Sequence, residues 1–252
     1  MTRYTLWIYS GTHGNLVNGD PFTQELFMVL KLLNQEGLLE FDVRTLIPGK
    51  NNDALKNEGL ISLPGITSYD DSTAICQSDE IIFYLQRKYN HSLILKDDED
   101  SKKVIEDFFR HFCYYIKNAT KESKNLTYEL RRVNNFLKKR RNNFLVGDHP
   151  TYLDCLVLAK LHTLRIAGKF LKGYEIPDYL ETLWEYINRG YSLDAFRKSC
   201  PSDQNIILFW SEKQGTPKLN ETFKVKLCNM TPVYSFGRTE YDFGTNNVFK
   251  SS

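Results

Sequence analysis

The first 33 residues contain a short apolar run, a glycine-containing segment and then apolar residues at helical spacing. Leu6–Tyr9 is apolar and aromatic, as a strand would be, and Gly11, Gly14 and Gly19 allow the tight backbone that must follow it. Pro21 suits the first turn of a helix, where the N–H that proline lacks would have no partner. The apolar residues that share one stripe of this helix are Phe22, Leu26, Val29, Leu30 and Leu33. The pattern predicts a strand, a turn and a helix.

Asp20 stands at the N-terminus of this predicted helix. Such a helix end can hold an anion or lower the pKa of a thiol. A cysteine at position 20 would complete the C-P-F-[ST] motif of a glutaredoxin-like site, because Pro21, Phe22 and Thr23 already match it. A carboxylate cannot form a mixed disulfide, but it is a good helix cap. The sequence therefore predicts a cap at Asp20 and no catalytic residue.

The next part of the chain continues with short strands and two more helices. The predicted elements are a strand at Leu38–Leu46, a helix within Asn51–Leu60, strands at Gly65–Ser68 and Ser72–Ile75, and a helix that begins at Gln77-Ser78. With Leu63-Pro64 before the two short strands, the order is β-α-β-α-Pro-β-β-α, which is typical of a thioredoxin-like domain. In such domains this proline is cis, although the dipeptide alone does not fix the isomer.

Beyond Lys96–Asp100, which is a charged link, the pattern is helical only. A long aromatic stripe comes first, which we interpret as core; its residues are Val104, Ile105, Phe108, Phe109, Phe112, Tyr115 and Ile116. A second helix, Leu126–Phe136, ends near Lys138–Arg141. This basic run is open to two interpretations. It is either a nuclear-import or anionic-lipid patch, or a solvated helix end whose cations suit the helix dipole.

Thr151 and Asp154 have the spacing of a reciprocal capping box, with Asp where Glu or Gln is commoner. The helix that follows carries little charge before Lys160, so we expect it to lie centrally in a helical bundle, with Thr151 and Asp154 as its structural N-cap. Its apolar positions are Leu156, Val157, Leu161, Leu164 and Ala167. His162 in this helix and His111 have no second histidine at i+4, so we interpret both as structural.

Together these stretches resemble the chloride intracellular channel (CLIC) family of the glutathione transferase superfamily. The N-terminal matches are Gly11-Thr12-His13-Gly14, Asp20–Gln24 and Leu26–Leu30, and the C-terminal ones are Asp154-Cys155, Lys160–His162, Gly173–Pro177, Tyr191–Phe196 and Ser199–Asp203. The resemblance covers about residues 4–213 and is remote around 95–140, and an acidic insertion of many vertebrate members is missing before the core helix. It implies a divergent member with Asp20 in place of the active-site cysteine.

The resemblance implies a glutathione-transferase-like fold, in which an α/β N-terminal thioredoxin-like domain precedes an all-α C-terminal domain. We place the first domain at residues 1–95, the helical domain at residues 101–212, and a C-terminal extension of unknown role at residues 213–252. The extension loses helical periodicity, yet it keeps several large apolar residues, so we expect it to pack on the body or to engage a protein partner. These residues are Phe223, Val225, Tyr234, Phe236, Tyr241 and Phe243.

A glutathione-like pocket is also implied by the resemblance. Its residues are Asp20, Pro21, Phe22, Leu63, Pro64, Gln77 and Ser78. In glutathione transferases, the pair that corresponds to Gln77-Ser78 binds the γ-glutamyl carboxylate of glutathione; a plain helix cap is the alternative. Asp20 would repel a glutathione thiolate and raise its pKa. We therefore expect no required cofactor, and glutathione stays open as a ligand.

Composition excludes several classes of function. The chain has 252 residues with a net charge of +2, which gives no nucleic-acid footprint. Its five cysteines are scattered without a C-x-x-C pair, which indicates a reducing compartment and neither a disulfide framework nor a zinc site. No H-E-x-x-H motif, signal peptide or long apolar run is present. We expect a cytoplasmic protein with no metal site.

Three functions remain. The resemblance implies a soluble protein that associates conditionally with membrane lipid, with chloride or other anion channel activity and with an oligomer left open in the membrane. The alternatives are a glutathione-dependent oxidoreductase or transferase, and a non-catalytic scaffold with the transferase fold. Thiol exchange needs an activated thiolate, which Asp20 does not provide, and Cys76 lacks a proline motif. We therefore expect the chain not to be an enzyme.

The family's proposed membrane-inserting segment corresponds to Asp20–Leu46. Its charged residues beyond Asp20 are Glu25, Lys31, Glu36, Glu40, Asp42 and Arg44. Each charge near the bilayer centre costs about 2.5–3.5 kcal/mol, so the segment would insert poorly without partners or snorkelling. Membrane contact would also require the N-terminal domain to leave the helical one. We expect acid to favour this step by protonating Glu25, Glu36, Glu40 and Asp42.

Overall fold

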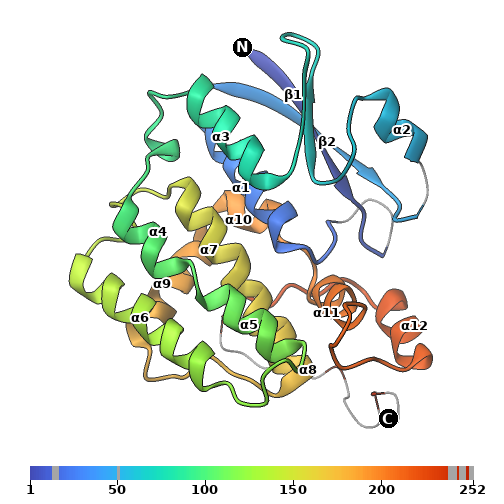
Figure 1. The fold of residues 1–252 in the computed structure, drawn as a ribbon, viewed down its shortest axis with the longest axis vertical. Coiled ribbons are helices and arrows are strands. Elements are labelled where there is room, and N and C mark those ends of the chain that lie inside the picture. Colours follow the sequence, from blue (N-terminus) through green and yellow to red (C-terminus); the bar gives the residue numbers. More distant parts are fainter. Residues whose placement is uncertain (13–16, 50–51, 238–242, 244–247, 250–252) are drawn as a thin grey trace.

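The computed structural model describes residues 1–12, 17–49, 52–237, 243 and 248–249. Gly14 and Tyr241, which the sequence analysis singled out, lie outside these residues. A sheet with its flanking helices forms the N-terminal part, and helices alone form the rest of the chain (Figure 1). The predicted combination of a thioredoxin-like domain with an all-helical domain is confirmed.

The N-terminal sheet has four strands in the order β2-β1-β3-β4. The strands are β1 (Thr2–Tyr9), β2 (Leu39–Leu46), β3 (Gly65–Ser68) and β4 (Thr73–Cys76). Strand β1 is parallel to β2 and antiparallel to β3, which is antiparallel to β4. Alternate residues of β1 face opposite sides: Leu6 and Ile8 pack in the main core, and Trp7 packs with Leu55 and Cys76 on the other side.

Three helices accompany this sheet, and α1 is buried on almost every side. They are α1 (Pro21–Gln35), α2 (Asn52–Asn57) and α3 (Ser78–Lys88). Four residues of the predicted α1 stripe are fully buried, whereas Phe22 is 42% exposed. Gln24 and Glu25, which lie beside the stripe, are buried as well. The reason is that α1 contacts β2 and α3 within the N-terminal part and also α7 and α10 of the helical part.

The helical part begins at Glu99. Its elements are α4 (Glu99–Ile105), α5 (Phe108–Ile116), α6 (Lys124–Arg140), α7 (Tyr152–Thr163), the π-helical turn η2 (Leu164–Gly168), α8 (Lys169–Lys172), α9 (Glu181–Ser192), α10 (Asp194–Ser199), α11 (Asp203–Ser211) and α12 (Glu221–Asn229); a 3-10 turn η1 (Leu93–Leu95) precedes them. The aromatic stripe predicted as continuous is divided between α4 and α5 at Glu106-Asp107. As predicted, α7 is central, and most of its side chains are buried.

The C-terminal extension differs from the expectation that it lacks helical structure. Asn220 accepts a hydrogen bond from the N–H of Phe223 at 2.8 Å and starts α12 there. Phe223 and Leu227 of this helix are buried, while Val225 is 58% exposed. Helix α12 lies against α11 (Figure 1). Of the two expectations for the extension, packing on the body is the one that the structure shows.

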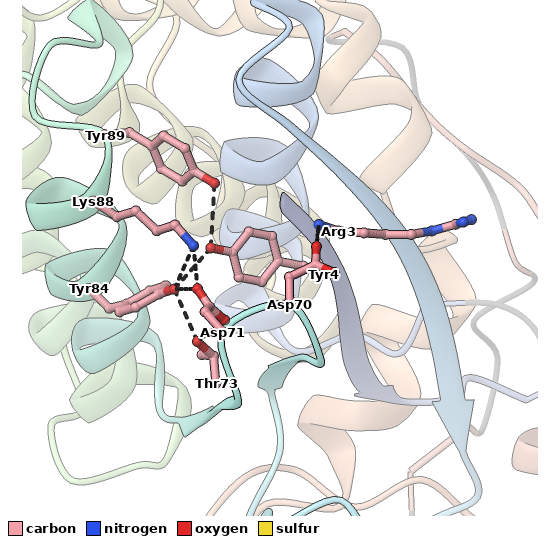
Figure 2. A network of polar contacts seen from close by, with 8 residues as sticks. All are labelled: Arg3, Tyr4, Asp70, Asp71, Thr73, Tyr84, Lys88 and Tyr89. Atoms are coloured by element: carbon pink, nitrogen blue, oxygen red, sulfur yellow. Dashed lines mark hydrogen bonds and ion pairs between the residues drawn. The ribbon is translucent and has the colours of Figure 1, made fainter. Parts of the chain in front are cut away.

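A polar network fixes α3 to the edge of the sheet (Figure 2). The Tyr84 hydroxyl donates to Asp71 at 2.7 Å and lies 3.0 Å from the Tyr4 hydroxyl, while Lys88 forms an ion pair with Asp71. The Lys88 ammonium also lies 5.2 Å from the centre of the Tyr4 ring. Burial opposes ionisation of Asp71, but the bonds from Lys88, Thr73 and Tyr84 together hold its pKa below the ordinary value. The network therefore joins β1, the β3–β4 turn and α3.

The start of α7 is built around the Asp154 carboxylate. Its Oδ2 accepts from the N–H of Thr151 at 2.8 Å and from the Thr151 hydroxyl at 2.9 Å. Its Oδ1 accepts from the N–H of Leu145 and from the Tyr186 hydroxyl, both at 2.9 Å. Burial of Asp154 raises its pKa, although these four bonds favour the charged form. Asp154 therefore joins α7, α9 and the preceding loop, which is more than a helix cap does.

This geometry predicts unequal losses of stability. Thr151→Ala should lower the free energy of unfolding by about 1 kcal/mol, as loss of a cap residue does. Asp154→Ala should lower it by about 3 kcal/mol, because Tyr186 and two backbone N–H groups lose a buried acceptor. The double variant should lose less than the sum, since the two side chains bond to each other. Urea unfolding measures all three, and equal, additive losses would contradict this interpretation.

Candidate functional site

Asp20 caps the N-terminus of α1 at the end of the loop that follows β1. Its carboxylate accepts from the N–H of Phe22 at 3.2 Å and from the Thr23 hydroxyl at 3.3 Å. Burial raises the pKa of Asp20, and these bonds together with Lys213 and Lys160 oppose that rise. The structure thus shows a carboxylate at the start of α1 with its bonds directed into the helix, which confirms the predicted cap.

Asn205, in the first turn of α11, holds the described ends of this loop. Its side-chain oxygen accepts from the N–H and the hydroxyl of Thr12, each at 3.1 Å, and its amide nitrogen donates to the Val17 carbonyl at 3.0 Å. A Cβ at Gly11 would lie 2.2 Å from the Asn205 side chain, and one at Gly19 would lie 2.4 Å from the Asn205 carbonyl. These glycines are therefore needed for close approach to α11, and the left-handed region is not the reason.

The start of α3 forms the other half of the predicted pocket. The Leu63-Pro64 peptide bond is cis, as the thioredoxin-like order implies. The N–H of Gln77 donates to the Pro64 carbonyl at 3.2 Å, which brings these two predicted residues together. Gln77 has φ of 68°, in the left-handed region, and its side chain does not cap α3. Ser78 is the first residue of the helix and is buried, so neither residue acts as the simple side-chain cap that was the alternative.

A cleft of about 670 Å³ runs between the N-terminal ends of α1 and α3 and the helices α4, α5 and α7. Phe22 is the one residue of the predicted pocket in its lining, and Asp79, next to Ser78, borders it as well. The other lining residues include aromatic, basic and acidic side chains: Phe108, Phe109, Tyr152, Lys102, Lys103, Arg110, Lys160, Glu99 and Glu106. The cleft is of a size that holds a small-molecule ligand. Its mixed charges give it no strong preference for anions.

The ion pair between Glu25 of α1 and Lys160 of α7 crosses the interface beside this cleft. Glu25 Oε2 lies 3.4 Å from the Lys160 ammonium, and the side chains are 1% and 18% exposed. The same ammonium lies 5.1 Å from the centre of the Phe22 ring and 5.7 Å from that of Phe109. From the sequence, Glu25 was predicted only as one of the charges in the proposed membrane-inserting segment. Its position three residues after Phe22 and four before Val29, on the apolar face, is the signal that could have identified it.

The titration of Glu25 corrects the expected effect of acid on this residue. Burial raises its pKa to about 7, and Lys160 limits the rise. The folded protein therefore holds a proton on Glu25 more tightly than the unfolded chain does, so acid stabilises the docked fold through Glu25. Protonation of Glu25 in solution therefore opposes undocking, while the expected effect of acid at the membrane stays a prediction. Glu36, Glu40 and Asp42 lie at the surface.

None of the chain's thiols takes the place of a nucleophile at this site. All five cysteines are free, and Cys76 packs with Trp7, Leu55 and Leu60 on the far face of the sheet. Burial raises the pKa of Cys113, Cys155 and Cys200, which keeps them as unreactive thiols.

Of the hydroxyls near α1, Ser10 is buried and Thr23 donates to Asp20. Among the described residues around the start of α1, none is a thiol with a lowered pKa.

His162 of α7 occupies a closed aromatic cluster. Its Nδ1 lies 3.1 Å from the Tyr191 hydroxyl, and its Nε2 lies 3.2 Å from the Cys200 sulfur. Arg165 approaches Nδ1 at 3.5 Å. Burial, and then the Arg165 charge, hold the pKa of His162 well below its ordinary value. This is a neutral structural histidine, as the sequence analysis predicted.

Within the part of the chain that the structure describes, no helix is long and apolar enough to cross a membrane. The same residues contain no group of histidine, cysteine and acidic side chains arranged to hold a metal ion.

Comparison with known proteins connects this geometry to a family. Residues 96–199 match the C-terminal domain of glutathione S-transferase. The chain is 35% identical over 243 residues to chloride intracellular channel exl-1 of Caenorhabditis elegans, and the match covers 94% of this chain and 99% of that protein. The chain belongs to the chloride intracellular channel family. Another CLIC protein, Clic of Drosophila melanogaster, is 30% identical over 207 residues, which are 81% of this chain and 76% of that protein.

Solved structures show the same fold. The CLIC homologue EXC-4 from C. elegans superposes with a TM-score of 0.82 at 24% identity, over 95% of this chain and 90% of that one. Dehydroascorbate reductase of Chlamydomonas reinhardtii superposes with a TM-score of 0.71 at 18% identity, over 82% of this chain and 96% of that one. At these identities the likeness shows the fold alone. This CLIC family member thus has the glutathione-transferase-like fold that its sequence predicts.

Because Asp20 caps α1, we expect this site to support very little thiol exchange. The unmodified protein should reduce a small disulfide with glutathione at a rate near background, because no thiolate stands at the end of α1. Asp20→Cys should raise that rate about tenfold or more, since the helix end stabilises a thiolate. A coupled assay of glutathione oxidation measures both. Rapid turnover by the unmodified protein would mean that the site has been misinterpreted.

Glu25 and His162 predict opposite responses to pH. The pKa of His162 is lowered on folding, so its contribution to stability falls as pH drops below about 6.5. The pKa of Glu25 is raised to about 7, so its contribution grows as pH falls from there towards its unfolded value.

As the pH is lowered from 6.5 to 5, the free energy of unfolding of Glu25→Gln should therefore fall faster than that of the unmodified protein. The difference in slope should be up to ~1.4 kcal/mol per pH unit. His162→Phe should shift the slope by up to ~1.4 kcal/mol per unit in the other direction. Urea unfolding at several pH values gives these slopes. Parallel curves for all three proteins would refute the assignment.

Proposed function

We propose that this protein associates reversibly with membranes by undocking α1 from the helical part, and that its membrane-bound form conducts chloride or other anions. The name chloride intracellular channel, carried by its relatives, motivates the conductance. The observation that carries the proposal is the position of α1, whose apolar residues are buried between the sheet and the helices α7 and α10. Separation of α1 from the helical part exposes this helix in a single step and leaves the helical bundle folded.

The Glu25–Lys160 ion pair is the contact that makes docking of α1, and so membrane association, conditional. Docking holds the carboxylate in a buried position beside a cation that retains some exposure. Such a pair contributes little net stability, because desolvation offsets the attraction, but loss of one partner strongly destabilises the buried state. The docked state therefore depends on this contact. Disturbing Lys160 releases α1, while replacing both partners with neutral groups restores docking.

Asp20 supports the choice of a membrane-associating protein over an enzyme. We infer that Asp20 replaces the cysteine that many family members carry at the start of α1, so that glutathione-dependent oxidoreductase or transferase activity is absent. A non-catalytic scaffold remains the second alternative. The cleft lined by Phe22 and Asp79 leaves glutathione as an optional ligand and not as a required cofactor, and the proposed function needs no metal.

Other partners and the location follow from the same proposal. Lipid is the main partner, and the exposed basic residues Lys138 and Lys139 at the end of α6 favour an anionic surface. The net charge of +2 gives no reason to invoke nucleic acid. Five free thiols favour the reducing cytoplasm, with a membrane-associated form that assembles there into an oligomer if it forms a pore.

Vesicle binding tests the role of the ion pair. At neutral pH, Lys160→Met should raise the fraction that co-sediments with vesicles of neutral and anionic phospholipid by about fivefold, because Glu25 is left buried without its cation. The double variant Glu25→Gln/Lys160→Met should return towards the unmodified protein. Chloride efflux from the same vesicles should follow the bound fraction.

Lys124→Met is the matched control, because Lys124 forms an ion pair with Glu122 in which both side chains are largely exposed. Removing such a pair changes little, so this variant should bind as the unmodified protein does. Identical binding by all four proteins would rule out undocking at α1, and binding without chloride efflux would rule out the conductance.

A further inference from the structure

Residues 231–237, here called the strap, follow α12 and lie across the first turn of α11. The N–H of Asp203 donates to the Val233 carbonyl at 2.8 Å. The Gln204 amide donates to the Thr231 carbonyl at 2.8 Å and accepts from the N–H of Val233 at 3.0 Å. Two residues of α11 thus bind three main-chain groups of the strap, as a sheet edge binds an added strand.

The second half of the strap is bound by two charged side chains. The Asp203 carboxylate accepts from the N–H of Ser235 at 3.3 Å and from the Ser235 hydroxyl at 2.5 Å. Arg165 donates to the Gly237 carbonyl at 2.9 Å and also to the Ser235 carbonyl. Asp203 and Gln204 are almost fully buried. When the strap leaves, these groups exchange its bonds for bonds to water, so the surface keeps the donors and acceptors that a replacement segment would use.

Phe236 is the strap side chain that enters a specific pocket. Its ring lies 5.4 Å from the Tyr191 ring, 6.1 Å from Phe196 and 6.3 Å from His162, measured between centres. The Arg197 guanidinium lies 5.1 Å from the centre of the Phe236 ring. Thr231 and Tyr234, in contrast, are exposed. Recognition therefore consists of main-chain bonds, a carboxylate for one hydroxyl and an aromatic pocket for the next residue.

We propose that this surface is a peptide-binding groove, occupied in cis by the strap, which accepts an extended segment of a partner protein in which a serine or threonine precedes an aromatic residue. The strap is suited to exchange. It has no regular secondary structure, and Val233, Ser235 and Phe236 are only partly buried. Contacts of this kind open locally at low free energy. The proposal does not depend on membrane association.

Replacement of the strap by a partner segment would affect the loop before Asp20. The reason is that Asn205 follows Asp203 and Gln204 in the same turn of α11. Asn205 bonds to Thr12 and Val17 on both sides of the loop before Asp20. A partner segment that replaces the strap would therefore lie one residue away from the contact that positions this loop.

The test measures binding of a fluorescent peptide, Thr-Pro-Val-Tyr-Ser-Phe-Gly, to the full chain by anisotropy. In the unmodified protein the strap competes at a high effective concentration. Ser235→Glu in the protein places a carboxylate against Asp203, which displaces the strap but leaves the groove unchanged. This variant should bind the peptide about tenfold or more tightly than the unmodified protein.

Thr231→Glu is the matched control, since it adds the same charge to the strap at an exposed side chain. It should bind the peptide as weakly as the unmodified protein. A peptide that carries Phe236→Ala should lose binding to the Ser235→Glu protein. If Ser235→Glu does not fold, Phe236→Ala in the full chain releases the strap in its place.

Equal peptide binding by the unmodified, Ser235→Glu and Thr231→Glu proteins would overturn the proposal. Retained binding of the Phe236→Ala peptide would do so as well, because the aromatic pocket would then have no role. Vesicle binding on strap release, without peptide binding, would assign the surface to lipid and would also overturn it.

Discussion

The contact between α1 and α7 is the constraint on which the rest of this structure depends. Helix α1 packs against the sheet on one side and against the helical bundle on the other, so most of its side chains are buried. The buried polar ones are Thr23, Gln24 and Glu25, and Glu25 is tolerated because Lys160 of α7 faces it. A buried carboxylate with a pKa of about 7 makes this interface sensitive to its surroundings. The joint between the two parts of the fold is therefore the natural place for a conformational change.

The first turn of α11 is a second place where distant parts of the chain are held together. Asp203 and Gln204 bind the strap, and Asn205 binds the loop that leads to Asp20. The loop after β1 and the strap thus meet on one turn of one helix. This explains why Gly11 and Gly19 are glycines: the loop backbone passes too close to Asn205 for a side chain. It also explains how a segment beyond the transferase-like body can belong to the same folded unit.

Most of the fold could be predicted from the sequence, because local patterns determine it. Pro21 after Asp20, the alternation in Leu39–Leu46 and the Thr151–Asp154 spacing each specify their element through neighbouring residues. The site could be predicted only in part. The cap at Asp20 depends on Phe22 and Thr23, which are adjacent in sequence. The Glu25–Lys160 pair joins residues far apart in the chain, and no local pattern connects them.

The same reason explains the other differences from expectation. The break between α4 and α5 was missed because the apolar stripe continues across Glu106-Asp107. Helix α12 was missed because its apolar residues keep no clear helical period of their own. The burial of Glu25 was missed because the residue was treated as one of the charges of a membrane-inserting segment, although it lies on the apolar face of α1. Its partner Lys160 lies far away in the sequence, so the pair itself could not be predicted.

The most direct test of the account is the distance between the two parts of the fold on a membrane. Spin labels at Phe83→Cys in α3 and Tyr128→Cys in α6 would report it, since both positions are 60% exposed. The partly exposed Cys113 and Cys228 would first be changed to serine. We predict one defined distance in solution and a longer distance when the protein is bound to vesicles. An unchanged distance in the vesicle-bound protein would contradict undocking of α1 and, with it, the proposed route to the membrane.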